Sequence, residues 1–194
     1  SSTFVQESPG KHRGYDYARS GNPTRGALEE SIAALEGGRY GFAMGSGCAA
    51  ADVVLHLLDA GDHVVSVDDV YGGTSRLFRT IWARHGVTTT FADLTNRHVS
   101  EFVTPKTRLI WVETPTNPAL NVIDIAAVIE RKQGALVAVD NTFATPVHQR
   151  PLELGADAVI HSTTKYLGGH SDTIGGALIV ADAELHQQVR LVEK

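Results

Sequence analysis

From residue 26 onward, short apolar runs alternate with segments whose apolar residues recur at helical spacing, such as Leu28, Ile32 and Leu35. Several of the short runs are almost continuously apolar, which is typical of strands buried on both faces of a parallel sheet. The expected strands are YGFAM, HVVSVDD, VTTTFAD, RLIWVET, ALVAVDN, DAVIHST and GGALIVAD. The alternation predicts an α/β fold with a mainly parallel sheet that helices cover on both faces.

The first 25 residues differ from the rest of the chain. They are polar, contain Pro9 and Pro23, and show no sustained period, which predicts an extended arm over residues 1–25. Residues 26–194 are expected to form one domain, because a chain of 194 residues that is 42% hydrophobic can bury a substantial core.

Composition and charge exclude several classes of protein. The 17 Lys and Arg residues are outnumbered by 22 Asp and Glu residues, so no nucleic-acid partner is expected. No run approaches the roughly 20 apolar residues that cross a bilayer, and the first residues lack the apolar core of a signal peptide. Cys48 is the single cysteine, which fits a reducing compartment. We therefore expect no membrane association and a cytoplasmic location.

Ligands of parallel sheets bind beyond the carboxyl ends of the strands, so chemistry is expected where the apolar runs end. The segment GSGCAA follows one such run and matches G-x-G-x-x-A, and Asp68 and Asp69 follow about 20 residues later. On spacing alone this pattern indicates a dinucleotide site and an NAD-dependent oxidoreductase. Its more general content is an anion site, because the backbone N–H groups of Gly47 and Cys48 would point at a phosphate from a helix N-terminus.

A second strand end carries a different chemistry. The run AVIHSTTKYLGG presents Ser162, Thr164 and Lys165 between an apolar strand and a Gly-Gly turn. A desolvated lysine in such a place becomes a nucleophile that can form a Schiff base, and hydroxyls beside it can hold a phosphate. Asp140 ends the apolar run ALVAVD, where a carboxylate needs a positive partner such as a pyridinium nitrogen. Together these features are the protein-side requirements of pyridoxal 5'-phosphate (PLP).

The same region contains side chains of the kind that bind metals. His161, His170 and Asp172 lie close together in sequence, but their spacing matches no standard ligand pattern. We therefore expect no metal site.

Six segments carry a specific resemblance. In order along nearly the whole chain they are YDYARSGNPTR, GSGCAA, DDVYGGTSRLF, WVETPTNP, VAVDNTF and HSTTKYLGGHSD. They resemble the cystathionine γ-lyase and cystathionine γ-synthase family, the Cys/Met-metabolism PLP enzymes of fold type I. The resemblance implies that Lys165 carries PLP as a Schiff base, that Asp140 pairs with the pyridine nitrogen, that Tyr71 stacks on the ring and that Asn117 lies near the cofactor's oxygen. The phosphate would be held by Gly47, Cys48, Ser162 and Thr164, with Tyr17 and Arg19 from a neighbouring subunit.

The resemblance also implies a domain organisation and an assembly. The fold would be that of the aspartate aminotransferase type, with a PLP-binding large domain over residues 26–194 that is C-terminally incomplete, because the family's small C-terminal domain is missing. The arm over residues 1–25 would contact a neighbouring subunit. The assembly would be a homotetramer built as a dimer of dimers.

The implied activity is γ-elimination or γ-replacement on a sulfur amino-acid substrate, namely cystathionine, cysteine or activated homoserine. Lys165, Tyr71 and Asp140 would be the catalytic residues of a cystathionine γ-lyase or γ-synthase in transsulfuration. An O-acetyl- or O-succinylhomoserine sulfhydrylase and a cystathionine β-lyase are alternatives. From other classes, the NAD-dependent oxidoreductase and a non-catalytic cofactor-binding fragment also stay open.

Overall fold

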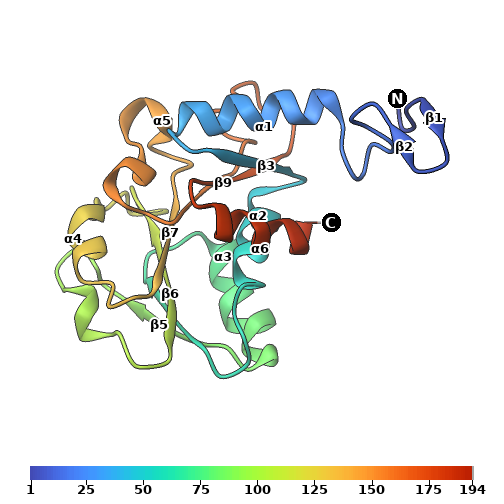
Figure 1. Cartoon of the computed structure of the whole chain (residues 1–194). Coiled ribbons are helices and arrows are strands. Elements are labelled where there is room, and N and C mark those ends of the chain that lie inside the picture. The colour runs from blue at the N-terminus through green and yellow to red at the C-terminus, as the bar shows by residue number, and fades with distance from the viewer. Residues whose placement is uncertain (194) are drawn as a thin grey trace.

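The computed structural model describes residues 1–193, and Figure 1 shows a layered α/β body with a small arm that projects from it at the N-terminus. The strands are β1 (Gln6–Ser8), β2 (Lys11–His12), β3 (Tyr40–Met44), β4 (His63–Val67), β5 (Thr88–Ala92), β6 (Thr107–Glu113), β7 (Leu136–Asp140), β8 (Ala158–His161) and β9 (Gly176–Val180). The α-helices are α1 (Pro23–Leu35), α2 (Gly47–Leu55), α3 (Gly72–Arg76), α4 (Ile125–Glu130), α5 (Thr145–His148) and α6 (Ala183–Glu193). None of the described helices is long and apolar enough to span a membrane.

Seven strands form one sheet in the order β3-β9-β8-β7-β6-β4-β5. Strands β5, β4, β6, β7 and β8 pair in parallel, and only β9 runs antiparallel to both of its neighbours, β8 and β3. The expected α/β fold with a mainly parallel sheet is confirmed. Because β3 and β8 both oppose β9, they run in the same direction, and their carboxyl ends meet those of β4, β6 and β7 at one edge.

Helices cover both faces of the sheet, and the two core layers can be read from alternate residues of β8 and β9. One layer packs against α1 and contains Ile32, Ala33, Val159, Ala177 and Ile179. The neighbouring strand residues point to the other face, where they meet α2 and α6; they are Ala158, Ile160, Leu178 and Val180. Figure 1 shows α1 on one side of β3 and β9 and α2 with α6 on the other.

Helix α1 begins three residues earlier than the expected start at Gly26. Asn22 caps it, because the Asn22 side chain accepts hydrogen bonds from the backbone N–H groups of Thr24 and Arg25. Pro23 occupies the first turn, where its missing N–H and fixed φ are tolerated. These local signals extend the helix into the region that the sequence assigned to the arm.

The segment TSRLFRTIWARHG is amphipathic and its pattern predicts a helix, but the structure does not form one continuous helix there. Helix α3 ends at Arg76, a π-helical turn follows over Leu77–Ile81, and a 3₁₀ turn over Trp82–His85 ends at Gly86. Gly86 has φ 84°, a left-handed conformation that glycine adopts without strain. Phe78 and Trp82, four residues apart, are both buried, as helical spacing predicts. The spacing does not predict that the segment changes from α-helix to a π-helical and then a 3₁₀ turn.

The arm forms the small hairpin β1–β2, and an isolated bridge pairs Thr3 with Tyr17. None of residues 1–20 is buried. Figure 1 shows the arm beyond the N-terminal end of α1, away from the sheet.

Candidate active site

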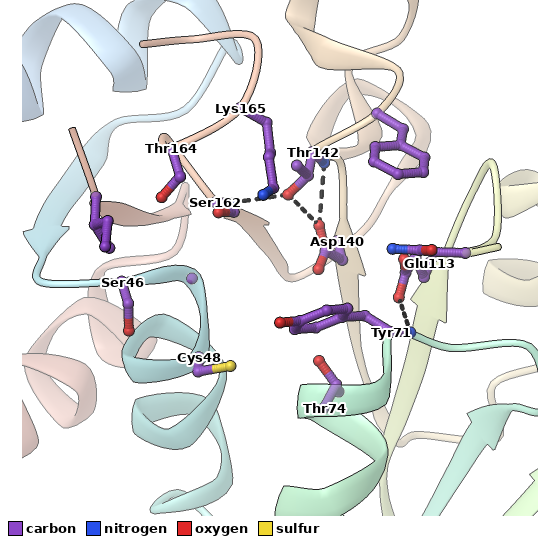
Figure 2. A pocket seen from close by; sticks show the side chains of 14 residues that line it. Ser46, Cys48, Tyr71, Thr74, Glu113, Asp140, Thr142, Ser162, Thr164 and Lys165 are labelled. Carbon is purple, nitrogen blue, oxygen red and sulfur yellow. Dashed lines mark hydrogen bonds between the residues drawn. The ribbon is translucent and has the colours of Figure 1, made fainter. Parts of the chain in front are cut away.

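A cavity of about 440 Å³ opens at the edge of the sheet where the parallel strands end. Its lining comes from the loops that follow β3, β4, β6, β7 and β8, as the topology predicts. The lining residues are Ser46, Gly47, Cys48, Tyr71, Thr74, Glu113, Asn117, Asp140, Thr142, Phe143, Ser162, Thr164, Lys165 and Ile174. Every site residue expected from the sequence lies here except Tyr17 and Arg19, and Figure 2 shows how the side chains face one another.

One end of the cavity is built for an anion. Ser46 caps α2 by accepting a hydrogen bond from the N–H of Ala49, which leaves the N–H groups of Gly47 and Cys48 without an intrahelical acceptor. A Cβ atom on Gly47 would lie 2.9 Å from the Cβ of Ser162, so only glycine lets the helix terminus approach β8 this closely. The two predicted phosphate segments therefore form one cup.

The thiol of Cys48 takes no charged role in this cup. Burial raises the pKa of the Cys48 thiol, so the side chain is neutral at physiological pH. The position contributes its backbone N–H, as the sequence indicated.

Asp140 ends β7 and lies at the opposite side of the cavity. One of its oxygens accepts hydrogen bonds from the N–H and the hydroxyl of Thr142, at 3.1 and 2.6 Å. No Lys or Arg within residues 1–193 forms an ion pair with this carboxylate. Burial raises the pKa of Asp140, against the opposing effect of the Thr142 hydrogen bonds. A cation in the cavity is what this carboxylate lacks.

Tyr71 and Glu113 form the floor of the cavity as Figure 2 draws it. The backbone N–H of Tyr71 donates to Oε2 of Glu113 at 2.8 Å, and the ring lies so close to Gly73 that a Cβ there would be 2.4 Å from Tyr71 Cε1. The phenol ring thus lies over Gly73 at the cavity, with 48% of the residue exposed. Burial, and next the negative charge of Asp140, raise the pKa of Glu113 to about 8.

Asn117 lies in the turn after β6, and Asp69 holds that turn. Oδ2 of Asp69 accepts hydrogen bonds from the hydroxyl of Thr116 and from the N–H of Ala119, the latter at 2.9 Å. Neither Asp68 nor Asp69 lines the cavity. The spacing of Asp68 and Asp69 that indicated a dinucleotide site thus has a different cause, since Asp69 joins two loops of the site by hydrogen bonds.

Lys165 comes from the loop between β8 and β9, and its side chain points into the cavity toward Asp140 and Tyr71 (Figure 2). The backbone N–H of Lys165 donates to the carbonyl of Ser162, which turns the loop back over the phosphate cup. Thr164 helps to hold this loop, because its hydroxyl bonds both the N–H and the carbonyl of Gly175. The sequence suggested a desolvated lysine, but Lys165 is exposed in this chain because the loop opens to solvent.

The residues present fit PLP. A lysine amine, a half-buried carboxylate without a cation and a helix N-terminus surround one cavity, and they match the aldehyde, the pyridine nitrogen and the phosphate of that molecule. Tyr71 supplies an aromatic face between them.

Tyr17 and Arg19 are not brought to the site within one chain. Both residues are exposed in the arm, and the Arg19 guanidinium lies 5.3 Å from the centre of the Tyr17 ring. Their expected place beside the phosphate of a neighbouring subunit stays a prediction.

Sequence reasoning missed several lining residues. Thr142 is the most informative, because it holds the Asp140 carboxylate and also accepts a hydrogen bond from the N–H of Ser162 at 2.8 Å. A hydroxyl two residues after a strand-end Asp is the signal that could have found it. The other missed residues are Ser46, Thr74, Glu113, Phe143 and Ile174.

Known proteins match the chain over its whole length. A cystathionine β-lyase from Coxiella burnetii is 51% identical over 99% of this chain and 51% of its own, and a cystathionine γ-synthase from Mycobacterium tuberculosis is 53% identical over 100% and 51%. The crystal structure of a cystathionine γ-lyase from Lactobacillus plantarum, complexed with L-serine, superposes with a TM-score of 0.95 at 46% identity, covering 100% of this chain and 51% of its own. The chain thus spans about half the length of the relatives it matches.

A family model agrees with these relatives. The model of the Cys/Met metabolism PLP-dependent enzymes matches residues 1–194. The expected family is confirmed by this match and by relatives that are about half identical in sequence. The chain belongs to the Cys/Met metabolism PLP-dependent enzyme family.

Proposed function

We propose that the protein is a PLP-dependent carbon–sulfur lyase or transferase of transsulfuration, a cystathionine γ-lyase or γ-synthase. The observation that carries the proposal is the convergence of Lys165, Asp140 and the N-terminus of α2 on one cavity. The names of the relatives support the same substrate class, because each of them acts on or makes cystathionine.

The binding roles follow from the cavity. The N–H groups of Gly47 and Cys48, with the hydroxyls of Ser162 and Thr164, would hold the phosphate of PLP. Asn117 would lie beside the oxygen of the cofactor ring.

The proposed catalytic roles of Asp140, Lys165 and Tyr71 are to hold or move a proton. When bound, PLP supplies an electron sink for negative charge at Cα of the amino acid joined to it. Asp140 holds a proton on the pyridine nitrogen, which keeps that sink effective. The Nζ of Lys165 would take the Cα proton of the substrate as general base. The ring of Tyr71 would cover the cofactor, and its hydroxyl would protonate the leaving sulfur.

Substrate assays test this proposal and separate its branches. The protein is supplied with PLP and assayed separately with cystathionine, with cysteine and acylated homoserine, and with acylated homoserine and sulfide. A γ-lyase or a β-lyase releases different thiols from cystathionine, a γ-synthase forms cystathionine, and a sulfhydrylase forms homocysteine. We expect turnover in the first or second assay and none in the Lys165→Ala protein. Wild-type activity in Lys165→Ala would refute the lysine assignment.

We further propose that the active site is shared between subunits, in a dimer at least and in a dimer of dimers. Arg19 lies in an arm in which none of residues 1–20 is buried, and its guanidinium suits bidentate phosphate capture. Residues 1–25 would then serve the neighbouring subunit, and residues 26–194 would form the PLP-binding domain. A single free Cys48 supports a reducing, cytoplasmic location.

Complementation tests the shared site. An inactive Arg19→Ala protein is mixed with an inactive Lys165→Ala protein, and subunit exchange is verified. In a mixed dimer one site combines an intact Lys165 with an intact Arg19, so activity should return. Exchange without activity would show that Arg19 serves its own subunit.

A further inference from the structure

Directly behind the active site, on the face of the sheet that α1 covers, lies a polar pair that the proposed chemistry does not use. Glu36 ends α1 and His161 ends β8, and both are 0% exposed. Oε1 of Glu36 accepts hydrogen bonds from Nε2 of His161 and from Nδ2 of Asn141, the latter at 2.8 Å. Neither Glu36 nor His161 lines the cavity.

The pair connects the strands that carry the site. Asn141 follows Asp140 directly, and its N–H donates to the carbonyl of Ile160 at 2.9 Å, which brings it beside His161. Successive residues of a strand point to opposite faces, so Asp140 faces the cavity while Asn141 faces α1. The residue after His161 is Ser162 of the phosphate cup.

Gln149 extends the network to a third strand. Its side-chain amide donates to Oδ1 of Asn141 and to the carbonyl of Thr114, both at 2.8 Å. Thr114 follows β6 and precedes the turn that bears Asn117. The ends of β6, β7 and β8 are thus fastened to one another and to α1 by side chains behind the sheet.

The energetics indicate that this network is not needed for stability. Oε2 of Glu36 and Nδ1 of His161 are buried and have no partner within residues 1–193, and unsatisfied buried polar atoms destabilise a fold. The surrounding layer is apolar, with Ile32, Val159 and Ile179, so leucines would fit the environment better. Hydrogen bonds have a preferred angle between donor and acceptor, which apolar contacts lack. The network can therefore orient the strand ends relative to one another.

We propose that Glu36 and His161 are positioning residues, which hold the ends of β7 and β8 so that Asp140 and Ser162 meet opposite ends of one PLP molecule. This inference rests on the proposed function, since it assumes that PLP is the ligand. It assigns the pair no contact with the cofactor. Its consequence is that cofactor geometry and fold stability can be separated by mutation.

The double variant Glu36→Leu/His161→Leu tests whether cofactor binding and fold stability can be separated. The apoprotein should unfold at the same denaturant concentration as the wild type or a higher one, because a buried polar pair has been replaced by leucines. Its dissociation constant for PLP should nevertheless rise by about tenfold or more, in line with outer-shell partners of other bound groups. The visible circular dichroism of bound PLP should fall, because the ring is no longer held in one orientation.

Three further variants make the result decisive. Ile32→Ala lies in the same layer and should lower stability while leaving PLP affinity and circular dichroism unchanged. Should the double variant fail to fold, Glu36→Gln and Glu36→Ala carry the same test. The glutamine keeps an acceptor for His161 and Asn141 and should retain PLP affinity, whereas the alanine should lose it.

The outcomes are distinct. A wild-type protein that takes up no PLP would refute the proposed function and this inference together. A wild type that binds PLP, with a double variant of equal affinity and equal circular dichroism, would refute only the positioning role. Glu36→Ala that binds PLP as well as Glu36→Gln would refute it in the same way.

Discussion

Glu113 makes the free energy of unfolding of the apoprotein depend on pH, which can be measured without any cofactor. The residue is 5% exposed, and burial together with the nearby Asp140 raises the pKa of Glu113 from 4.5 to about 8. A carboxyl whose pKa is raised by folding favours the folded state below its unfolded pKa, and that contribution is lost as the pH rises through the folded pKa. The stability of the apoprotein should therefore fall between pH 4.5 and about 8.

The size of this stability change follows from the difference between the unfolded and the folded pKa of Glu113. At ~1.4 kcal/mol per pH unit, a pKa moved from 4.5 to about 8 corresponds to about 5 kcal/mol, an upper limit because Glu113 shares its interaction with Asp140. Glu113→Gln removes the titration but keeps an oxygen that can accept the hydrogen bond from the N–H of Tyr71. Relative to wild type, this variant should become progressively more stable from pH 5 to pH 8, by several kcal/mol in all.

Urea unfolding of both apoproteins at a series of pH values is the assay. Glu101→Gln is the control, because the hydrogen bond from Arg97 lowers the pKa of that exposed carboxyl below 4.5, so the stability difference between this variant and wild type should stay flat across pH 5 to 8. Parallel curves for wild type and Glu113→Gln across pH 5 to 8 would refute the buried-carboxyl argument.

Three other substitutions test separate parts of the site. Asp140→Asn should weaken PLP binding by about 1.5–3 kcal/mol, because a charge-assisted contact is lost, and turnover should fall further; equilibrium binding and kinetics check it, and normal turnover would contradict it. Tyr71→Phe should keep PLP affinity and lower kcat, whereas an unchanged kcat would limit Tyr71 to stacking. Gly176→Ala would place Cβ 2.0 Å from the carbonyl oxygen of Ser46, so it should lower stability by about 1–3 kcal/mol and weaken PLP binding, as thermal unfolding and a PLP titration would show.

Residues with a strong local signal were predictable from the sequence. Asp140 ends one apolar strand, and Lys165 lies in the loop after another. Because the carboxyl ends of parallel strands meet at one edge of the sheet, the two residues were expected to lie close together without tertiary information. Asp124 precedes the apolar run IAAVIE, a position that predicts a helix N-cap, and its side chain does accept a hydrogen bond from the N–H of Ala127. The G-x-G-x-x-A pattern located a helix N-terminus at the cavity correctly.

Features set by contacts between distant segments were not predictable. The position of Asp69, about 20 residues after the G-x-G-x-x-A segment, indicated a dinucleotide site. Its carboxylate instead accepts a hydrogen bond from Thr116, which is 47 positions away. Glu36 and His161 are 125 positions apart, and no periodicity joins them. The direction of β9 was also not predicted, because an apolar run has the same pattern whichever way the strand points.

The central claim is that Lys165 holds PLP covalently, and chemical trapping tests it most directly. The protein is loaded with PLP, reduced with borohydride, digested and mapped by mass spectrometry. We expect the reduced pyridoxyl group on the peptide that contains Lys165 and loss of the visible absorption band. Lys132, which pairs with Asp157 outside the cavity, should stay unlabelled and serves as the internal control. Label on Lys132 in place of Lys165, or no label on either lysine, would contradict the account.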